Sequence, residues 1–273
     1  MKPLLHWLHG FLPGPVAVNG VERFRACCGA LIGIFLTGLV TRLVLGPSAN
    51  VPLLIAPMGA SAVLLFAAPA SPLAQPWSII GGNMISAAIG VTCALSIADP
   101  TLAAAMAAAS AIGVMFALRC LHPPSGAVAL TAVLGGPAIH AQGFYFVLSP
   151  VGINSLLLLL VALLFNNSTG RRYPHPSHLD HANTHRTSDL RTSDRLGFTP
   201  EDLDDVLKKY NQVLDVSRDD LESLFLQTEM HAYRRRFGEI TCADIMSRDI
   251  VTVEFGALLQ DARAQLLEHH IKA

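Results

Sequence analysis

The feature that most limits the fold is a long stretch almost free of charge. Between residues 26 and 165 only Arg42, Asp99 and Arg119 carry a full charge, and apolar residues make up 52% of the chain. The first 165 residues hold five of the 19 basic and two of the 20 acidic side chains. This division excludes a soluble single-core enzyme and a nucleic-acid-binding protein with a basic face. The first part of the chain needs lipid.

Several apolar runs are long enough, or nearly so, to cross a hydrocarbon core of about 30 Å, which takes about 20 helical residues. We expect spanning helices at about 24–44, 51–69, 77–97 and 143–165. The Ala-rich run 101–118 is shorter, and its small residues favour close packing inside a bundle. The segment 122–137 is too short to cross alone, because a helix from Pro124 to Gly136 reaches only about 20 Å.

The basic residues around this block predict its topology. Lys2, Arg23 and Arg25 precede it and Arg171 and Arg172 follow it, so both termini are expected in the cytoplasm. Termini on one side require an even number of crossings, so 122–137 is predicted to cross, or to dip deeply. The predicted location is a bacterial inner (plasma) membrane.

A weak internal repeat appears when the block is moved along itself by about 67 residues. The segment Pro57-Met58-Gly59-Ala60 then falls on Pro124-Ser125-Gly126-Ala127, and amides recur at Asn83 and Asn154. With small gaps, Arg42 and Arg119 both end the first helix of a group of three. Three crossings per unit would invert the second copy in the membrane. Inverted repeats with Pro/Gly-interrupted segments at matching positions are typical of secondary transporters.

The predicted site uses the starts of two short helices. Proline begins a helix without losing a hydrogen-bond donor, and the small residues behind Pro57 and Pro124 leave backbone N–H groups accessible. Together with the helix dipoles, these groups favour an anion. The candidate substrate-binding residues are Pro57, Gly59, Ser61, Asn83, His122, Pro123, Pro124, Ser125, Gly126 and Asn154, with Ser86 and Ser155 as further hydroxyl donors. Arg42 and Arg119 are candidates for attracting or gating the anion at opposite mouths.

Other interpretations of the same residues stay open. Helix-starting prolines, small-residue faces and buried Asn–Ser bonds also occur in membrane bundles that transport nothing. The alternative function is therefore a non-transporting membrane sensor or scaffold with a sealed core. An uncharged solute is a second alternative substrate. An intramembrane enzyme has no support, since no catalytic triad, zinc spacing or phosphate loop is present.

The segment His122-Pro123-Pro124-Ser-Gly-Ala resembles the signature of the HPP family of integral membrane proteins. The segments 57–63, Gln75-Pro76-Trp77 and Gly81-Gly82-Asn83 are also similar to the family pattern, and the resemblance covers about residues 20–166. Some members are associated with nitrite transport, so the resemblance implies nitrite as the first candidate anion. It carries over to Pro57, Gly59, Asn83 and 122–126, and implies no catalytic role.

Residues 166–273 form the tail, which carries most of the charged side chains and is expected to be soluble. Residues 167–199 are expected to form a polar linker, whose spaced histidines lack a framework for holding a metal. Residues 200–239 show two amphipathic helices, the first opened by Thr199-Pro200 and the second by Ser217. From Ile240 the sequence resembles the opening of a CBS domain, with a strand at 250–253 and a helix at 258–269.

These observations predict an all-α polytopic membrane bundle of about six helices, a soluble helical linker and a truncated α/β CBS module. The predicted domains are 1–23 (interfacial), 24–166 (transmembrane), 167–199, 200–239 and 240–273. We expect a transporter of a small inorganic anion, without a cofactor or metal, that a C-terminal CBS module regulates in the full-length protein. In the alternative function, the sensor or scaffold anchors this module. The expected partners are the lipid bilayer, an adenosine nucleotide in a complete pair of CBS domains, and a second copy of the chain, but no nucleic acid. The five cysteines are expected to be small buried side chains rather than disulfides.

Overall fold

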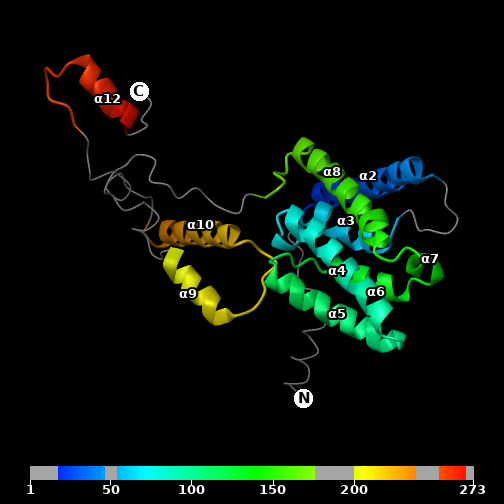
Figure 1. Ribbon diagram of the computed structural model, residues 1–273. Helices are drawn as coiled ribbons and strands as arrows, with labels where there is room; N and C mark the ends of the chain where they lie inside the picture. Colours follow the sequence, from blue (N-terminus) through cyan, green and yellow to red (C-terminus); the bar gives the residue numbers. More distant parts are fainter. Residues whose placement is uncertain (1–17, 47–53, 176–199, 238–251, 269–273) are drawn as a thin grey trace. The chain divides into compact units, whose positions relative to one another are not determined.

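The computed structural model describes residues 18–46, 54–175, 200–237 and 252–268, and their regular elements are all helical (Figure 1). The chain divides into two units, Met1–His175 and Pro176–Ala273. The predicted interfacial segment 1–23 and linker 167–199 lie mostly outside the described residues.

The described part of the first unit contains long helices and two short apolar ones, in the order long, short, long, long, short, long. Four helices are long and apolar enough to cross a membrane, and two shorter apolar helices lie between them. The long ones are α2 (Gly20–Leu45), α4 (Pro76–Ser96), α5 (Pro100–Ala117) and the run formed by η2 (Val147–Gly152) and α8 (Ile153–Ser168). The short ones are α3 (Pro57–Ala67) and α6 (Pro124–Leu134), with η1 (Pro72–Ala74) and α7 (Pro137–His140) in the connections.

The prediction of a full span at 51–69 is therefore wrong. The described part of that run becomes helical only at Pro57, and α3 has 11 residues, which reach about 16 Å. The helix α6 also has 11 residues, which agrees with the prediction that 122–137 is too short. The apolar composition was interpreted correctly, but proline moved the start of α3 and left two half-length helices instead of one.

Local sequence explains where these helices begin. Proline occupies the first helical turn of α3, α4, α5, α6 and α7, where its missing N–H costs nothing. The side chain of Asn19 accepts a hydrogen bond from the Glu22 N–H at the start of α2, and Asp99 does the same for Leu102 at the start of α5. Acidic Asp99 is thus a helix cap rather than a buried proton carrier.

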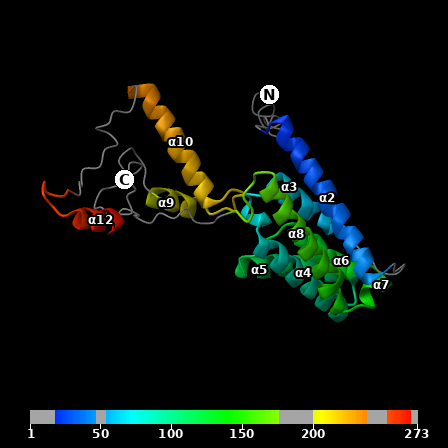
Figure 2. The same cartoon turned by 90° about the horizontal axis from the view of Figure 1, so that it is seen from above.

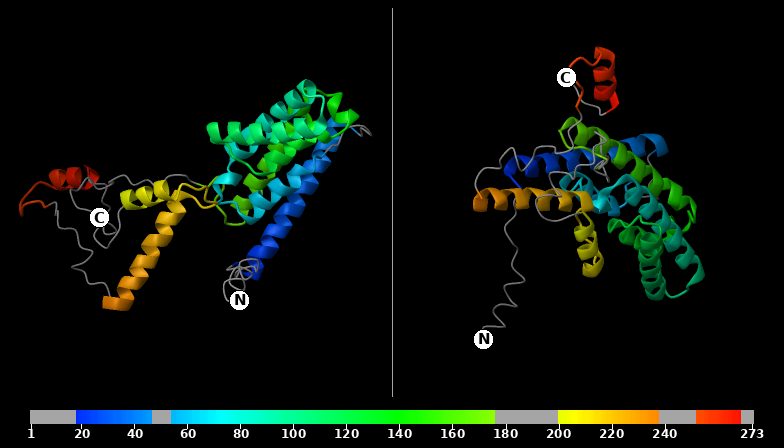
Figure 3. Two further views of the ribbon diagram at one scale, coloured as in Figure 1. Left: turned by 90° about the horizontal axis from the view of Figure 1, so that it is seen from below. Right: turned by 90° about the vertical axis from the view of Figure 1, so that its left-hand side faces the viewer.

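Contacts between the helices give the direction of the chain. Arg25, near the start of α2, bonds the last turn of α3 and the last turn of α8. The start of α4 lies at this same end, because the Tyr173 hydroxyl after α8 donates to the Ala74 carbonyl just before α4. We call this the Arg25 end. Figures 2 and 3 show α2 and α5 on opposite flanks of the bundle, with α3, α4, α6 and α8 between them.

The surface of the bundle is apolar, as a lipid-facing surface should be. On α2 the side chains of Val21, Phe24, Leu31 and Leu43 are exposed by 71% or more, while Gly29 and Gly33 face inward against the ring of Phe66. The prediction that all cysteines are buried holds for Cys120 but not for Cys27, which is exposed on α2. A lipid-facing position accepts a thiol as easily as the core does.

The second unit contains α9 (Pro200–Tyr210), α10 (Arg218–Phe237) and α12 (Leu259–Glu268). Helices occupy both predicted segments, and Ser217 caps α10 through the Asp220 N–H at 3.0 Å. The predicted amphipathic pattern is found in α9, whereas the apolar residues of α10 are not gathered on one face. Arg218 joins the two helices by an ion pair with Asp204 at 2.7 Å. This pairing lowers the pKa of the Asp204 carboxyl below its usual value.

The α/β character predicted for the tail is not found in the described residues. Thr252 and Val253, the described half of the predicted strand 250–253, adopt no strand, whereas the helix predicted at 258–269 is present as α12. An extended segment forms a strand only when another strand pairs with its backbone, and no described segment does so. The rest of the CBS-like opening lies outside the described residues.

Candidate functional site

The first turns of α3 and α6 have the same geometry. Ala56 and Pro123, the residues before the two helices, share nearly identical helical torsion angles of φ −53°, ψ −38° and φ −52°, ψ −40°. Their tight turns are closed by matching backbone bonds of 2.9–3.1 Å. The N–H groups of Met58, Gly59, Ser125 and Gly126 donate to the carbonyls of Ile55, Ala56, His122 and Pro123, respectively.

These turns use the backbone N–H groups that the sequence analysis assigned to anion binding. The N–H groups behind Pro57 and Pro124 were expected to be free, but the turns already use those of residues 58, 59, 125 and 126. The reason is that Ala56 and Pro123 are themselves helical, so each turn begins one residue before its proline. The N–H group that the turn before α3 leaves available to a side chain or ligand is instead that of Ile55.

Asn154 on α8 occupies that donor. Its amide oxygen accepts from the Ile55 N–H at 3.2 Å, and its amide nitrogen donates to the Thr41 hydroxyl on α2 at 3.3 Å. Asn154 and Thr41 are fully buried, and Ile55 is 2% exposed. The side chain therefore caps the positive end of α3 from a different helix, at the position where a ligand oxygen would bind.

Asn83 on α4 makes the corresponding contact with the start of α6. Its amide oxygen accepts from the Ser125 hydroxyl at 2.8 Å, and its amide nitrogen donates to the Ser155 hydroxyl at 2.9 Å. Asn83 on α4 thus reaches the start of α6, and Asn154 on α8 reaches the start of α3. The two predicted asparagines are placed reciprocally.

His122 and Ser61 link the two short helices. The Leu73 carbonyl lies 2.8 Å from His122 Nδ1 and can only accept, so Nδ1 carries the hydrogen. In the neutral ring Nε2 then accepts from the Ser61 hydroxyl, also at 2.8 Å. Gly82 is packed between these groups, because an added Cβ would lie 2.8 Å from the Cys120 carbonyl and from the Ser125 hydroxyl. The HPP segment is therefore held in place by α4.

The buried faces of α3 and α6 match residue by residue. Each buried residue of α3 has a buried counterpart 67 positions later in α6. The buried residues are Pro57, Met58, Ser61, Ala62, Leu65 and Phe66 in α3, and Pro124, Ser125, Val128, Ala129, Ala132 and Val133 in α6. The sequence alignment that suggested a repeat covered only the first four residues of these two helices, and the matching buried positions extend along both helices.

The far ends of the short helices correspond as well. The Phe66 carbonyl accepts from Arg25 at 2.7 Å, and the Val133 carbonyl accepts from His140 at 2.8 Å. Arg25 also pairs with Glu22, which in turn pairs with Arg171 at 2.7 Å. Sequence reasoning used Arg25 and Arg171 only to predict topology, although an acid three residues before Arg25 at the edge of an apolar helix was an available signal.

The remaining predicted residues lie outside these contacts. Gly59 is exposed and Gly126 half-buried, and an added Cβ on either would meet nothing within 4 Å. Ser86 contacts the Met115 sulfur at 3.7 Å rather than the two asparagines. Arg42 and Arg119 are both exposed, Arg42 near the end of α2 and Arg119 after α5, so they belong to opposite ends of the bundle.

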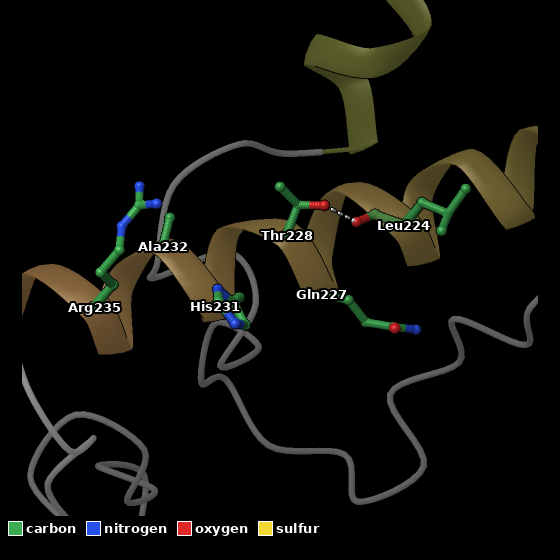
Figure 4. Close-up of a pocket in the computed structure, with 6 residues that line it drawn as sticks. All are labelled: Leu224, Gln227, Thr228, His231, Ala232 and Arg235. Carbon is green, nitrogen blue, oxygen red and sulfur yellow. Dashed lines mark hydrogen bonds between the residues drawn. The ribbon is translucent and has the colours of Figure 1, made fainter. Parts of the chain in front are cut away.

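A separate hollow lies in the second unit, along one face of α10 (Figure 4). Its described lining comes from α10 alone: Leu224, Gln227, Thr228, His231, Ala232 and Arg235. The Thr228 hydroxyl donates to the Leu224 carbonyl four residues earlier, so it is engaged in its own helix. No group of three His, Cys, Asp or Glu side chains suited to a metal occurs among the described residues.

The fold and the buried polar contacts define a polytopic helical membrane protein. The family description "HPP, transmembrane region" matches residues 15–174, and the chain belongs to this family. Two proteins of Dictyostelium discoideum, each named only as a transmembrane protein, are similar to it. One is 40% identical over 126 residues (44% of this chain, 40% of the relative) and the other 39% over 131 residues (46% of each).

The chain spans less than half the length of these curated relatives. No solved structure matches it. The family match ends at residue 174, so it gives no support to a CBS domain in the tail.

Proposed function

We propose that this protein transports a small inorganic anion, with nitrite as the first candidate, between the starts of α3 and α6. The observation that carries the proposal is the reciprocal placement of Asn83 and Asn154. Each amide comes from one group of three helices and meets the short helix of the other. A ligand that displaces these amides would contact both groups at once, as a substrate must in a transporter built from two related halves.

The chemistry of the interior favours an anion over a cation. The acidic residues of the membrane bundle are already used: Glu22 pairs with Arg25 and Arg171, and Asp99 caps α5. The polar groups around α3 and α6 are hydroxyls, amides, an imidazole and helix starts. Such neutral donors bind a singly charged anion without the carboxylates that a cation site needs.

The proposed mechanism is an exchange at Asn154. In the conformation described, its amide oxygen satisfies the Ile55 N–H, so the site is closed by the protein's own groups. An arriving anion would take over this hydrogen bond and release the amide. Because an unpaired buried polar group costs about 1–3 kcal/mol, the site would not open unless the anion replaces the lost contact.

Six crossings in two inverted groups of three, α2–α3–α4 and α5–α6–α8, form part of the proposal. The support is the match between the buried residues of α3 and α6 at an offset of 67 positions, together with the similar contacts at both ends of these helices. The Arg25 end also holds Arg119 and Arg171, which favours a cytoplasmic location for this end and hence for both termini. A bacterial inner membrane remains the proposed setting.

The alternative function is a non-transporting sensor or scaffold. The hydrogen bonds of Asn83 with Ser125 and Ser155 favour this alternative, because these amide and hydroxyl groups bond one another without a ligand. A complete pair of CBS domains that binds an adenosine nucleotide is a proposal for either function, and it rests on the sequence from Ile240 alone. Its test is whether ATP or AMP changes the measured flux of a chain that carries both domains.

The deciding experiment is nitrite flux into proteoliposomes containing the full chain, with chloride, nitrate and formate as competitors. We expect saturable uptake that is lost in the double variant Asn83→Leu/Asn154→Leu. The single variant Asn154→Asp is a gentler test. Its carboxylate can still accept from Ile55 and Thr41, but places a fixed negative charge where the anion would bind.

The matched control is Asn167→Leu, which removes an amide at the end of α8 that bonds Leu163 and Tyr173. This variant is expected to transport nitrite. Uptake of no anion by folded wild-type protein, or full activity of both asparagine variants, would favour the sensor or scaffold.

A further inference from the structure

Thr37 on α2 has a buried hydroxyl without a hydrogen-bond partner. The side chain is 0% exposed, and its Oγ1 is one of three buried polar atoms found unpaired in the described part of the chain. Thr92 and Thr131, on α4 and α6, instead donate to the carbonyls four residues earlier in their own helices, at 2.8 and 2.7 Å. A buried hydroxyl that does not form even this bond within its own helix destabilises the fold, so its presence needs an explanation.

The position of Thr37 on α2 directs attention to the start of α3. Gly33, Thr37 and Thr41 follow one another at intervals of four residues, so they share one face of the helix. An added Cβ on Gly33 would contact Phe66 and Leu158, and Thr41 accepts from Asn154. Thr37 therefore lies between two points at which α2 packs against α3 and α8, one helical turn from the Asn154 contact.

We propose that the hydroxyls of Thr37 and Thr41 and the N–H of Ile55 form a subsite for the oxygens of a monovalent oxyanion. The inference rests on the proposed function and adds the residues that select the substrate. Thr41 accepts from Asn154 and keeps its own hydrogen to donate. When the amide of Asn154 moves away, the Ile55 N–H joins the two hydroxyls as a third neutral donor.

The same donors define the class of substrate. No charged side chain contributes to the subsite, so a bound anion is stabilised only by hydroxyls and the start of α3. This suffices for a small, singly charged ion such as nitrite, nitrate or formate. A dianion such as sulfate would bring a second charge into the interior, where no counter-charge would offset its loss of hydration.

The corresponding groups near α6 offer no such free donor. The hydroxyl hydrogen of Ser125 is donated to Asn83 and that of Ser61 to His122. Ser155 accepts from Asn83, as Thr41 accepts from Asn154, but has no unpaired hydroxyl like that of Thr37 beside it in the described bundle. In the described bundle, the one buried hydroxyl without a partner is that of Thr37 on α2. The subsite is accordingly assigned to the group formed by α2, the start of α3 and α8, rather than spread equally between both short helices.

The test uses Thr37→Val, Thr37→Ser and the control Thr92→Val in the full chain in detergent. Thermal unfolding is followed with and without nitrite, and nitrite affinity is measured by titration. Valine keeps the shape of threonine but removes the unpaired hydroxyl, so Thr37→Val is expected to unfold at a higher temperature. Its affinity for nitrite is expected to fall about tenfold, the effect of one lost hydrogen bond.

Thr37→Ser keeps the hydroxyl and should bind nitrite like the wild type, as should Thr92→Val. If Thr37→Val gains stability with unchanged nitrite affinity, the subsite is wrong while the transport proposal stands. If folded wild-type protein binds no monovalent oxyanion, both proposals fail. Sulfate binding as tight as nitrite binding would overturn the assignment of the substrate class.

Discussion

The carbonyl oxygens of Phe66 and Val133 lie at equivalent positions near the ends of α3 and α6, 67 residues apart, and each accepts from a basic side chain outside its helix. For Phe66 the donor is Arg25, whose side chain is 10% exposed and also bonds Glu22 and Asn166. For Val133 the donor is His140, which is exposed. The two short helices are therefore held with unequal strength.

This inequality predicts different costs for the two substitutions. Arg25→Ala removes the partner of the Phe66 carbonyl and one of the partners of Glu22 and of Asn166 in a mostly buried position, and should destabilise the protein by about 2–4 kcal/mol. His140→Ala removes one bond at an exposed position and should cost about 1 kcal/mol or less. Thermal unfolding of both variants in one detergent makes the comparison, and equal losses would contradict it.

A second prediction concerns the packing of α4 against α6. An added Cβ on Gly90 would lie 2.6 Å from the Ala129 carbonyl and 2.8 Å from the Ala132 Cβ. Gly90→Ala should therefore lower the free energy of unfolding by about 1–3 kcal/mol through overpacking. The control is Gly113→Ala on α5, where the new Cβ meets nothing within 4 Å and helix propensity alone predicts a gain of up to about 1 kcal/mol.

A third prediction concerns Tyr173, which follows α8 and is 2% exposed. Its hydroxyl donates to the Ala74 carbonyl at 2.6 Å, and burial raises the pKa of this phenol well above its usual value. Tyr173→Phe should lose about 1–2 kcal/mol, because the Ala74 carbonyl is left unpaired. In a spectroscopic titration of the wild type, one tyrosine should stay protonated when the pH passes 10, and this signal should be absent from the variant.

The last prediction is a pH dependence in the second unit. The Arg218 guanidinium holds the pKa of the Asp204 carboxyl below its ordinary value of 3.8. A lowered carboxyl pKa stabilises the pairing of α9 with α10 above pH 3.8, and the effect is lost as the pH falls through the shifted value. It should be small, because the Asp204 side chain is 46% exposed.

The check is a carbon-13 NMR titration of the Asp carboxyl groups in wild type and Arg218→Gln. Asp204 should titrate at higher pH in the variant than in the wild type. An unchanged midpoint would show that the ion pair does not form in solution.

Sequence patterns predicted most of the helices but not their lengths. The start of α5 after Asp99, the cap of α10 at Ser217 and the shortness of α6 all follow from residues that are neighbours in the chain. The run 51–69 was misjudged because hydropathy averages over a window, while a helix begins at a particular residue. Pro57 fixed that residue, and 11 helical residues remained.

For the candidate site, the sequence identified residues but not their contacts. Asn83 and Asn154 stood out because amides are costly in an apolar block, and both are fully buried. Their partners Ser125, Ser155, Ile55 and Thr41 lie between 42 and 113 residues away in the chain. The unpaired Thr37 was not noticed, because a threonine in an apolar helix carries no signal until its surroundings are known.

The sequence by itself determined that this chain enters a membrane, where its helices begin and which polar side chains the interior must accommodate. These properties depend on local composition and on the conformational limits of proline and capping residues, which act within a few positions. Only the tertiary structure decided that Asn154 caps α3, that Asn83 reaches α6 and that Thr37 stays unpaired. Those outcomes depend on which distant groups become neighbours, because a buried hydrogen bond forms only when packing brings donor and acceptor within about 3 Å.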